Sequence, residues 1–152
     1  MVSYAQESVE LTSERTPYSK MFLTSDGSKE QIISPQLIHY ELDGEWLPID
    51  LTLEEEADRY VNRENALISS FPGLLENGSM IELIYNNASI SIGGVKQFIK
   101  YTELTGLEMI DLTLNASEGI VSDESISYED IYDEIDDKYT ILKGAVKNEL
   151  IL

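Results

Sequence analysis

The fold is decided by residues 79–92, which read Ser79-Met80-Ile81-Glu82-Leu83-Ile84-Tyr85-Asn86-Asn87-Ala88-Ser89-Ile90-Ser91-Ile92. A two-residue loop at Asn86-Asn87 fixes the strand register, because Asn tolerates the positive φ of a type I′ turn. The expected cross-strand pairs are Tyr85 with Ala88, Leu83 with Ile90, and Ile81 with Ile92. One face of this hairpin is then apolar and the other largely polar, so the pattern predicts a sheet with one buried face.

Most of the remaining sequence follows the same pattern of short strands and tight turns. The Asp43-Gly44 turn pairs strand 37–42 with strand 45–49 and sets Tyr40 opposite Leu47. Further turns are expected at Asp26-Gly27 and Lys143-Gly144. The sequence therefore predicts an all-β fold, mainly antiparallel, as a two-layer sandwich or open barrel with at most one or two short helices.

Two segments have weaker patterns. The acidic run Glu54–Glu56 is expected on a loop or a single helical turn, because glutamates are poor strand formers. Between residues 93 and 125, Val95, Phe98 and Ile99 have helical spacing, whereas Leu112-Thr113-Leu114 alternates as in a strand, so we expect at most one short helix there.

The chain of 152 residues suits one folded domain. Residues 1–17 are polar and end at Pro17, so we expect an extended lead-in, followed by a single β domain over 18–152. The sequence stops on an apolar strand, which favours a fragment of a longer chain.

Composition excludes several classes of protein. Asp and Glu total 29 against 10 Lys and Arg, which gives a net charge of −19. This charge repels phosphate backbones and anionic lipids, so we expect neither a nucleic-acid partner nor membrane insertion. The absence of cysteine excludes thiol nucleophiles and cysteine-ligated zinc.

A series of short motifs follows one another along the chain. They are Thr12-Ser13-Glu14-Arg15-Thr16, Tyr18-Ser19-Lys20, Ile38-His39-Tyr40, Asp43-Gly44-Glu45-Trp46, Ile49-Asp50, Leu53, Tyr60-Val61-Asn62, Glu64-Asn65-Ala66, Tyr128-Glu129-Asp130-Ile131-Tyr132, Asp136, Tyr139-Thr140, Lys147 and Glu149-Leu150-Ile151-Leu152. Their order resembles a secreted bacterial β module, which lies near the N-terminus of large wall-associated proteins with Rhs/YD repeats and of surface proteins with DNRLRE-type domains. The resemblance covers about residues 11–152, and it departs from the family pattern at Asp133-Glu134, where the family has a proline-containing turn.

This resemblance implies a non-enzymatic structural or adhesion module of a large surface protein, in some members a contact-dependent toxin. It implies an extracellular or cell-wall location and no catalytic residues in this module. The implied partners are downstream domains of the same chain and cell-wall or glycan polymers. The alternative is a carbohydrate-binding module, with or without calcium.

Three groups of residues are candidate sites. Trp46 and Tyr40 could stack on a sugar ring, although aromatic residues in strands also fill cores. The only histidine, His39, is expected to pack in its strand rather than to act as a general base. Six carboxylates supply the oxygen ligands that calcium prefers, or form a solvated acidic turn without any cofactor. These are Glu129, Asp130, Asp133, Glu134, Asp136 and Asp137.

Overall fold

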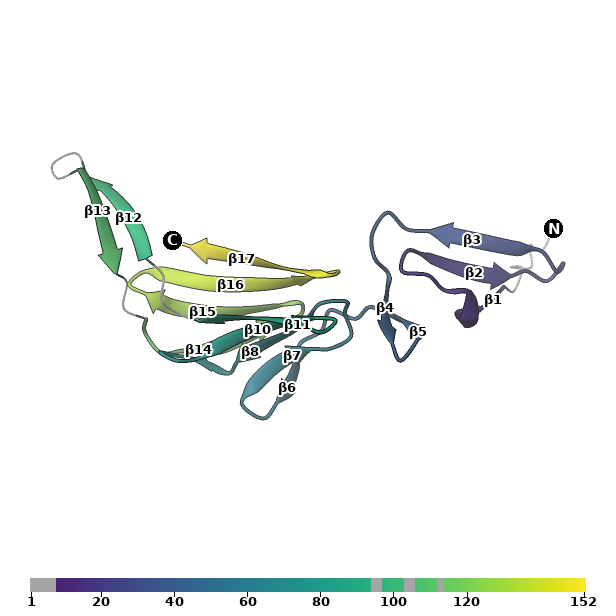
Figure 1. Ribbon diagram of the computed structural model, residues 1–152, viewed down its shortest axis with the longest axis horizontal. Coiled ribbons are helices and arrows are strands. Elements are labelled where there is room, and N and C mark those ends of the chain that lie inside the picture. Colours follow the sequence, from purple (N-terminus) through teal and green to yellow (C-terminus); the bar gives the residue numbers. More distant parts are fainter. Residues whose placement is uncertain (1–7, 94–96, 103–105, 112–113) are drawn as a thin grey trace, which may run out of the picture. The chain divides into compact units, whose positions relative to one another are not determined.

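A computed structural model describes residues 8–93, 97–102, 106–111 and 114–152 of the chain. Its elements are short and follow one another closely along the sequence (Figure 1). They are β1 (Val9–Glu10), the 3-10 helix η1 (Thr12–Glu14), β2 (Ser19–Leu23), β3 (Lys29–Ile33), β4 (His39–Leu42), β5 (Glu45–Pro48), β6 (Glu54–Glu56), β7 (Arg59–Asn62), β8 (Ile68–Pro72), β9 (Leu74–Leu75), β10 (Met80–Tyr85), β11 (Ala88–Gly93), β12 (Gln97–Thr102), β13 (Gly106–Asp111), β14 (Ser117–Ser122), β15 (Ser125–Tyr132), β16 (Ile135–Leu142) and β17 (Ala145–Ile151).

The fold is all-β, as the sequence predicts, and every strand pair given for the described residues is antiparallel. The sheets are open, and η1 is the only helix among the described residues. Phe98, whose neighbours have helical spacing in the sequence, lies in strand β12, which pairs with β13. Helical spacing over so few residues does not distinguish a helix from a strand.

The chain forms two compact units, which differs from the single domain expected over 18–152. Unit 1 comprises Met1–Asp50 and Glu64–Ala66, and unit 2 comprises Leu51–Arg63 and Leu67–Leu152. Unit 1 contains a three-stranded sheet, β1-β2-β3, and the β4–β5 hairpin. The expected lead-in before Pro17 includes β1 and η1, and β1 pairs with β2.

Unit 2 is built around a sandwich of two five-stranded sheets. One sheet has the order β11-β10-β8-β7-β6, and the other has the order β17-β16-β15-β14-β9. Side chains from both sheets share one hydrophobic core, in which the rings of Phe71 on β8 and Tyr139 on β16 lie 5.4 Å apart. Burial of this apolar surface is the main force that holds two such sheets together.

The β10–β11 hairpin has the register that the sequence predicts. Tyr85 lies opposite Ala88, Leu83 opposite Ile90, and Ile81 opposite Ile92. Burial of the apolar face is confirmed only on the β10 side: Ile81 is 2% exposed, whereas Ile90 is 63% exposed. The reason is that β11 is the edge strand of its sheet, so a neighbouring strand covers it from one side only.

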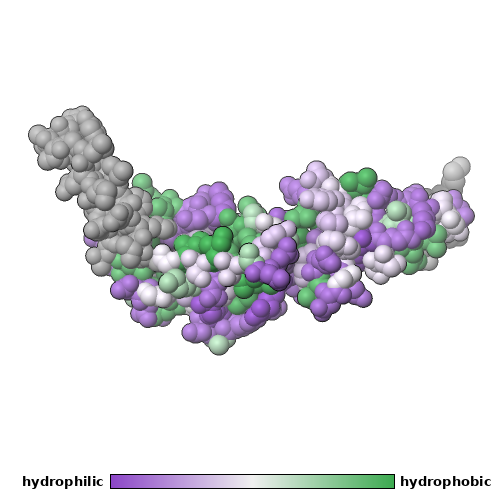
Figure 2. Space-filling view, viewed as in Figure 1, coloured by the Kyte–Doolittle hydropathy of each residue, from purple (hydrophilic) through white to green (hydrophobic). Residues whose placement is uncertain are grey.

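Strand β6 occupies the segment for which we expected a loop or a helical turn. Glu54–Glu56 forms an edge strand that pairs with Arg59–Val61 of β7. Charged side chains are common on edge strands, where they discourage pairing with other chains. The face drawn in Figure 2 shows hydrophobic patches among hydrophilic residues on the surface of the chain.

Candidate functional site

A buried carboxylate lies inside the sandwich of unit 2. Asp137 on β16 is 2% exposed. It accepts hydrogen bonds from the Tyr139 hydroxyl, at 2.8 Å, and from the side-chain amide of Asn148. Burial raises the pKa of the Tyr139 phenol, and the nearby Asp137 carboxylate raises it further. The phenol therefore stays protonated and donates to the carboxylate.

Tyr128 joins the two sheets of the sandwich by a hydrogen bond. Its ring is fully buried, and its hydroxyl on β15 donates to the carbonyl oxygen of Pro72 on β8 at 2.7 Å. Burial raises the pKa of this phenol as well. The bond satisfies a main-chain acceptor that burial has removed from water.

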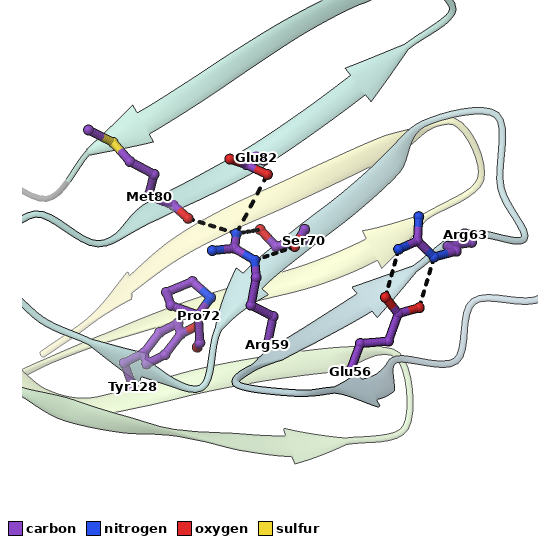
Figure 3. Close-up of polar contacts among 8 residues, drawn as sticks. All are labelled: Glu56, Arg59, Arg63, Ser70, Pro72, Met80, Glu82 and Tyr128. Atoms are coloured by element: carbon purple, nitrogen blue, oxygen red, sulfur yellow. Dashed lines mark hydrogen bonds and ion pairs between the residues drawn. The ribbon is translucent and has the colours of Figure 1, made fainter.

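Arg59 connects three strands of the sheet that contains β8 (Figure 3). Its Nε donates to the Ser70 hydroxyl oxygen at 2.6 Å, and its Nη2 donates to the Ser70 carbonyl at 3.1 Å and the Met80 carbonyl at 2.8 Å. The Glu82 carboxylate lies 4.0 Å away. These contacts hold the guanidinium within the sheet, so Arg59 on β7 links this strand to β8 and β10.

Arg63 and Glu56 form a second, more exposed pair in the same view (Figure 3). Arg63 Nε and Nη2 donate to the two carboxylate oxygens of Glu56 at 2.8 and 2.6 Å. The hydrogen bond from Arg63 lowers the pKa of Glu56. The two-point geometry fixes the β6 edge to the end of β7, although solvent screens the attraction.

A shallow hollow of about 460 Å³ lies around the β14–β15 turn. Its lining mixes hydroxyl groups with two carboxylates and one lysine, so its net charge is negative. The lining residues are Ser122, Asp123, Glu124, Ser125, Lys138 and Thr140.

The candidate aromatic pair, Tyr40 and Trp46, does not form one surface. Tyr40 lies opposite Leu47, whereas Trp46 lies opposite Glu41, so the two aromatic residues project from opposite faces of the β4–β5 hairpin. Tyr40 is 8% exposed and belongs to the buried residues of unit 1.

The acidic run is divided between the interior and the surface. Glu129, Asp130 and Asp133 are exposed, and the turn Asp133-Glu134 joins β15 to β16. Asp136 accepts a hydrogen bond from the Asp130 backbone amide at 2.8 Å, while Asp137 faces the core. In the parts of the chain that the structure describes, no three His, Cys, Asp or Glu side chains are grouped so that they could hold a metal ion.

His39 is fully buried in unit 1. Its Nδ1 lies 2.7 Å from the Thr16 carbonyl oxygen, which can only accept, so Nδ1 carries the proton. A histidine without exposed surface cannot reach a substrate. Its position opposite Pro48 agrees with the expected packing within the hairpin.

Sequence analysis did not single out Arg59 or the interior position of Asp137. A pattern in the sequence marks Asp137, because it alternates with Ile135, Tyr139 and Ile141 and therefore shares their face of β16. No comparable pattern marks Arg59, whose partners come from the distant strands β8 and β10.

Comparison with known proteins finds no matching family model and no matching solved structure. Three curated relatives match the chain. It is 27% identical over 146 residues to the tRNA(Glu)-specific nuclease WapA of Bacillus subtilis subsp. natto (strain BEST195). It is 26% identical over 148 residues to the tRNA nuclease WapA of Bacillus subtilis (strain 168), and 26% identical over 146 residues to the tRNA3(Ser)-specific nuclease WapA of Bacillus spizizenii.

Each match covers 94% of this chain but only 6% of the relative. The chain therefore spans a small part of the length of these proteins. Among the described residues, no helix is long and apolar enough to cross a membrane.

The relatives correct three expectations from the sequence. They are named as nucleases, which overturns the expectation of a non-enzymatic adhesion module and the alternative of a carbohydrate-binding module. They are named for tRNA, which overturns the expectation that nucleic acid is not a partner. The physical reason for the error is that charge and motifs were judged on a segment that corresponds to 6% of the relatives.

Proposed function

We propose that this chain is a segment of a tRNA nuclease of the WapA type. The observation that carries the proposal is the extent of the similarity, which runs over 94% of the chain in three relatives with this name. The two-sheet sandwich, with its buried Tyr128–Pro72 hydrogen bond, is then one folded part of a much longer polypeptide.

In this proposal, cleavage of tRNA is an activity of the whole polypeptide. The net charge of −19 opposes the approach of a phosphate backbone to this segment. Cleavage is therefore assigned to the polypeptide as a whole.

The segment also does not determine which tRNA is cleaved. One relative is named for tRNA(Glu) and another for tRNA3(Ser), yet both match this chain over the same 94% of its length and with 27% and 26% identity. We expect that exchange of this segment between such proteins leaves the choice of tRNA unchanged.

We further propose that the polypeptide is a secreted, wall-associated toxin in which this segment is an N-terminal β module. The order of motifs that resembles Rhs/YD-repeat proteins supports this location.

The experiment is a tRNA cleavage assay with the longest polypeptide that the gene encodes. Purified protein is incubated with total tRNA, and the products are separated on a denaturing gel. The proposal expects discrete tRNA fragments from this polypeptide. Intact tRNA with the longest polypeptide, under conditions in which a known ribonuclease is active, would overturn it.

A further inference from the structure

The turn at residues 76–79 is the point at which the chain passes from one sheet of the sandwich to the other. Strand β9 before it pairs with β14, whereas β10 after it pairs with β8 and β11. The Ser79 amide donates to the Glu76 carbonyl at 2.9 Å, and Gly78 has φ +95°. This hydrogen bond and positive φ at the third position are those of a type II turn.

The two central residues of this turn are Asn77 and Gly78, and both are exposed. A Cβ atom built at Gly78 would have nothing within 4 Å, so the space beside its backbone is open. Neither the Gly78 amide nor the Asn77 side chain is hydrogen-bonded to another residue in the described part of the chain. The Gly78 amide nitrogen can therefore approach Cγ of the Asn77 side chain.

The chain has six other asparagines, and the structure holds most of them in place. None of the six precedes glycine, so a Cβ atom crowds the following amide nitrogen in each case. Asn62 and Asn65 are almost fully buried. The side-chain amides of Asn115 and Asn148 donate to Asp130 and Asp137, respectively.

We propose that Asn77 is a site of spontaneous deamidation. The Gly78 backbone nitrogen attacks Cγ of Asn77 and forms an N–Cγ bond. The Cγ–Nδ2 bond breaks, and the proton lost by the backbone nitrogen leaves with the amide as ammonia. Water then opens the five-membered succinimide at either carbonyl, which gives aspartate or isoaspartate, and no oxidant or reductant is required.

The two Asp-Gly pairs of the chain, Asp26-Gly27 and Asp43-Gly44, have the same spacing but a weaker electrophile. A carboxylate resists attack because it already carries a negative charge. Hydrogen bonds from Thr24 and Ser28 lower the pKa of Asp26 to about 2, so this carboxyl group stays ionised near neutral pH. The reaction is therefore specific to Asn77.

The two products differ in their effect on the fold. Aspartate adds one negative charge beside Glu76 and leaves the backbone unchanged. In isoaspartate the main chain passes through Cβ and Cγ, so the turn contains one more backbone atom. Because this turn links the two sheets, we expect isoaspartate to break the Ser79–Glu76 hydrogen bond and to destabilise unit 2.

The test uses the 152-residue chain in water enriched in oxygen-18, at mildly alkaline pH. Fragment-ion sequencing of its peptides locates each Asn residue that has exchanged its side-chain nitrogen for labelled oxygen. A synthetic peptide with residues 73–82 serves as the unfolded reference. We expect label at Asn77 and none at Asn86 or Asn87, which are exposed but precede Asn and Ala. An unlabelled Asn77 after the peptide has reacted fully, or equal labelling at all three, would overturn the proposal.

The Asn77→Asp variant is the matched control for the structural consequence. It has the charge of one product without the added backbone atom. We expect this variant to unfold at the same denaturant concentration as the fresh protein, and the isoaspartyl fraction, separated by ion exchange, to unfold at a lower one. Identical unfolding of the isoaspartyl fraction would contradict the role assigned to the turn.

Discussion

The Tyr128 hydroxyl donates a hydrogen bond to the Pro72 carbonyl at 2.7 Å, across 56 positions of sequence and between the two sheets of the sandwich. The Tyr128 ring has no exposed surface. A buried hydrogen bond with this geometry aligns the end of β8 with the middle of β15, and its loss leaves a carbonyl without a donor.

The Tyr128→Phe variant tests this relationship. We expect it to lose about 1–3 kcal/mol of unfolding free energy, because the Pro72 carbonyl stays buried without its partner. Chemical denaturation followed by circular dichroism measures the loss. The control is Tyr85→Phe, which alters a residue that is 57% exposed and should change stability by less than about 0.5 kcal/mol. Equal stability of the two variants would show that the bond contributes nothing.

Arg59 on β7 and Arg63 directly after this strand allow a comparison of partly buried and exposed contacts. Arg59→Met keeps the apolar stem but removes the donors to Ser70 and Met80, so we expect a loss of about 1–3 kcal/mol. Arg63→Met removes only the pair with Glu56, whose side chains are 59% and 41% exposed, so we expect about 0–1 kcal/mol. Denaturation curves measure the loss of unfolding free energy in both variants. A larger loss for Arg63→Met would contradict the stabilising role of the hydrogen bonds that Arg59 makes between strands.

Alkaline pH is expected to destabilise unit 2 through its buried tyrosines. Burial raises the pKa of Tyr128 and Tyr139 above the ordinary value of 10.0. Their contribution is fully present below this value. Above it, the unfolded chain loses these protons while the folded chain keeps them, so stability falls by about 1.4 kcal/mol per pH unit for each tyrosine.

Denaturation curves at a series of pH values above and below 10.0 check this slope. The Tyr128→Phe variant should have a shallower decline than the unmodified protein, because it lacks one of the phenols with a raised pKa. The same steepness in both proteins would contradict the assignment.

The sequence predicts hairpins best where the turn and the apolar pattern agree. The register of β10–β11 follows from the Asn86-Asn87 loop, and that of β4–β5 follows from Asp43-Gly44. Both depend on residues close together in the chain. Local information was sufficient for these elements.

Strand β6 was missed although its partner β7 is the next strand along the chain, because its composition is untypical of strands. Glu54–Glu56 has a poor strand composition, yet it pairs with β7 and Glu56 binds Arg63. The interior position of Asp137 was also missed. The charge of Asp137 suggested exposure, whereas its position on β16 places it against the core.

Gly119 explains why strand β14 was difficult to predict. Glycine is a poor strand former, but a Cβ atom here would lie 2.7 Å from Ile126 Cδ1 and 3.3 Å from Tyr128 Cε1. The small residue at this position leaves room for side chains of the neighbouring strand β15.

The Gly119→Ala variant is therefore expected to cost about 1–3 kcal/mol from overpacking. Ile126→Val removes the crowded Cδ1 atom and alone should cost about 0.5–1.5 kcal/mol. Since the second change makes room for the first, the double variant should lose less than the sum of the single losses. Additive losses in denaturation experiments would mean that Ile126 does not limit the space at residue 119.

The proposed function, as part of a longer tRNA nuclease, is tested most directly on the natural polypeptide. An antibody raised against residues 67–152 captures the natural polypeptide from wall, medium and cell fractions of the source organism, and each captured sample is sized and incubated with tRNA. The account predicts a polypeptide much larger than 17.1 kDa that cleaves tRNA, in the wall or medium fraction. A 17.1 kDa polypeptide inside the cell that leaves tRNA intact would contradict it.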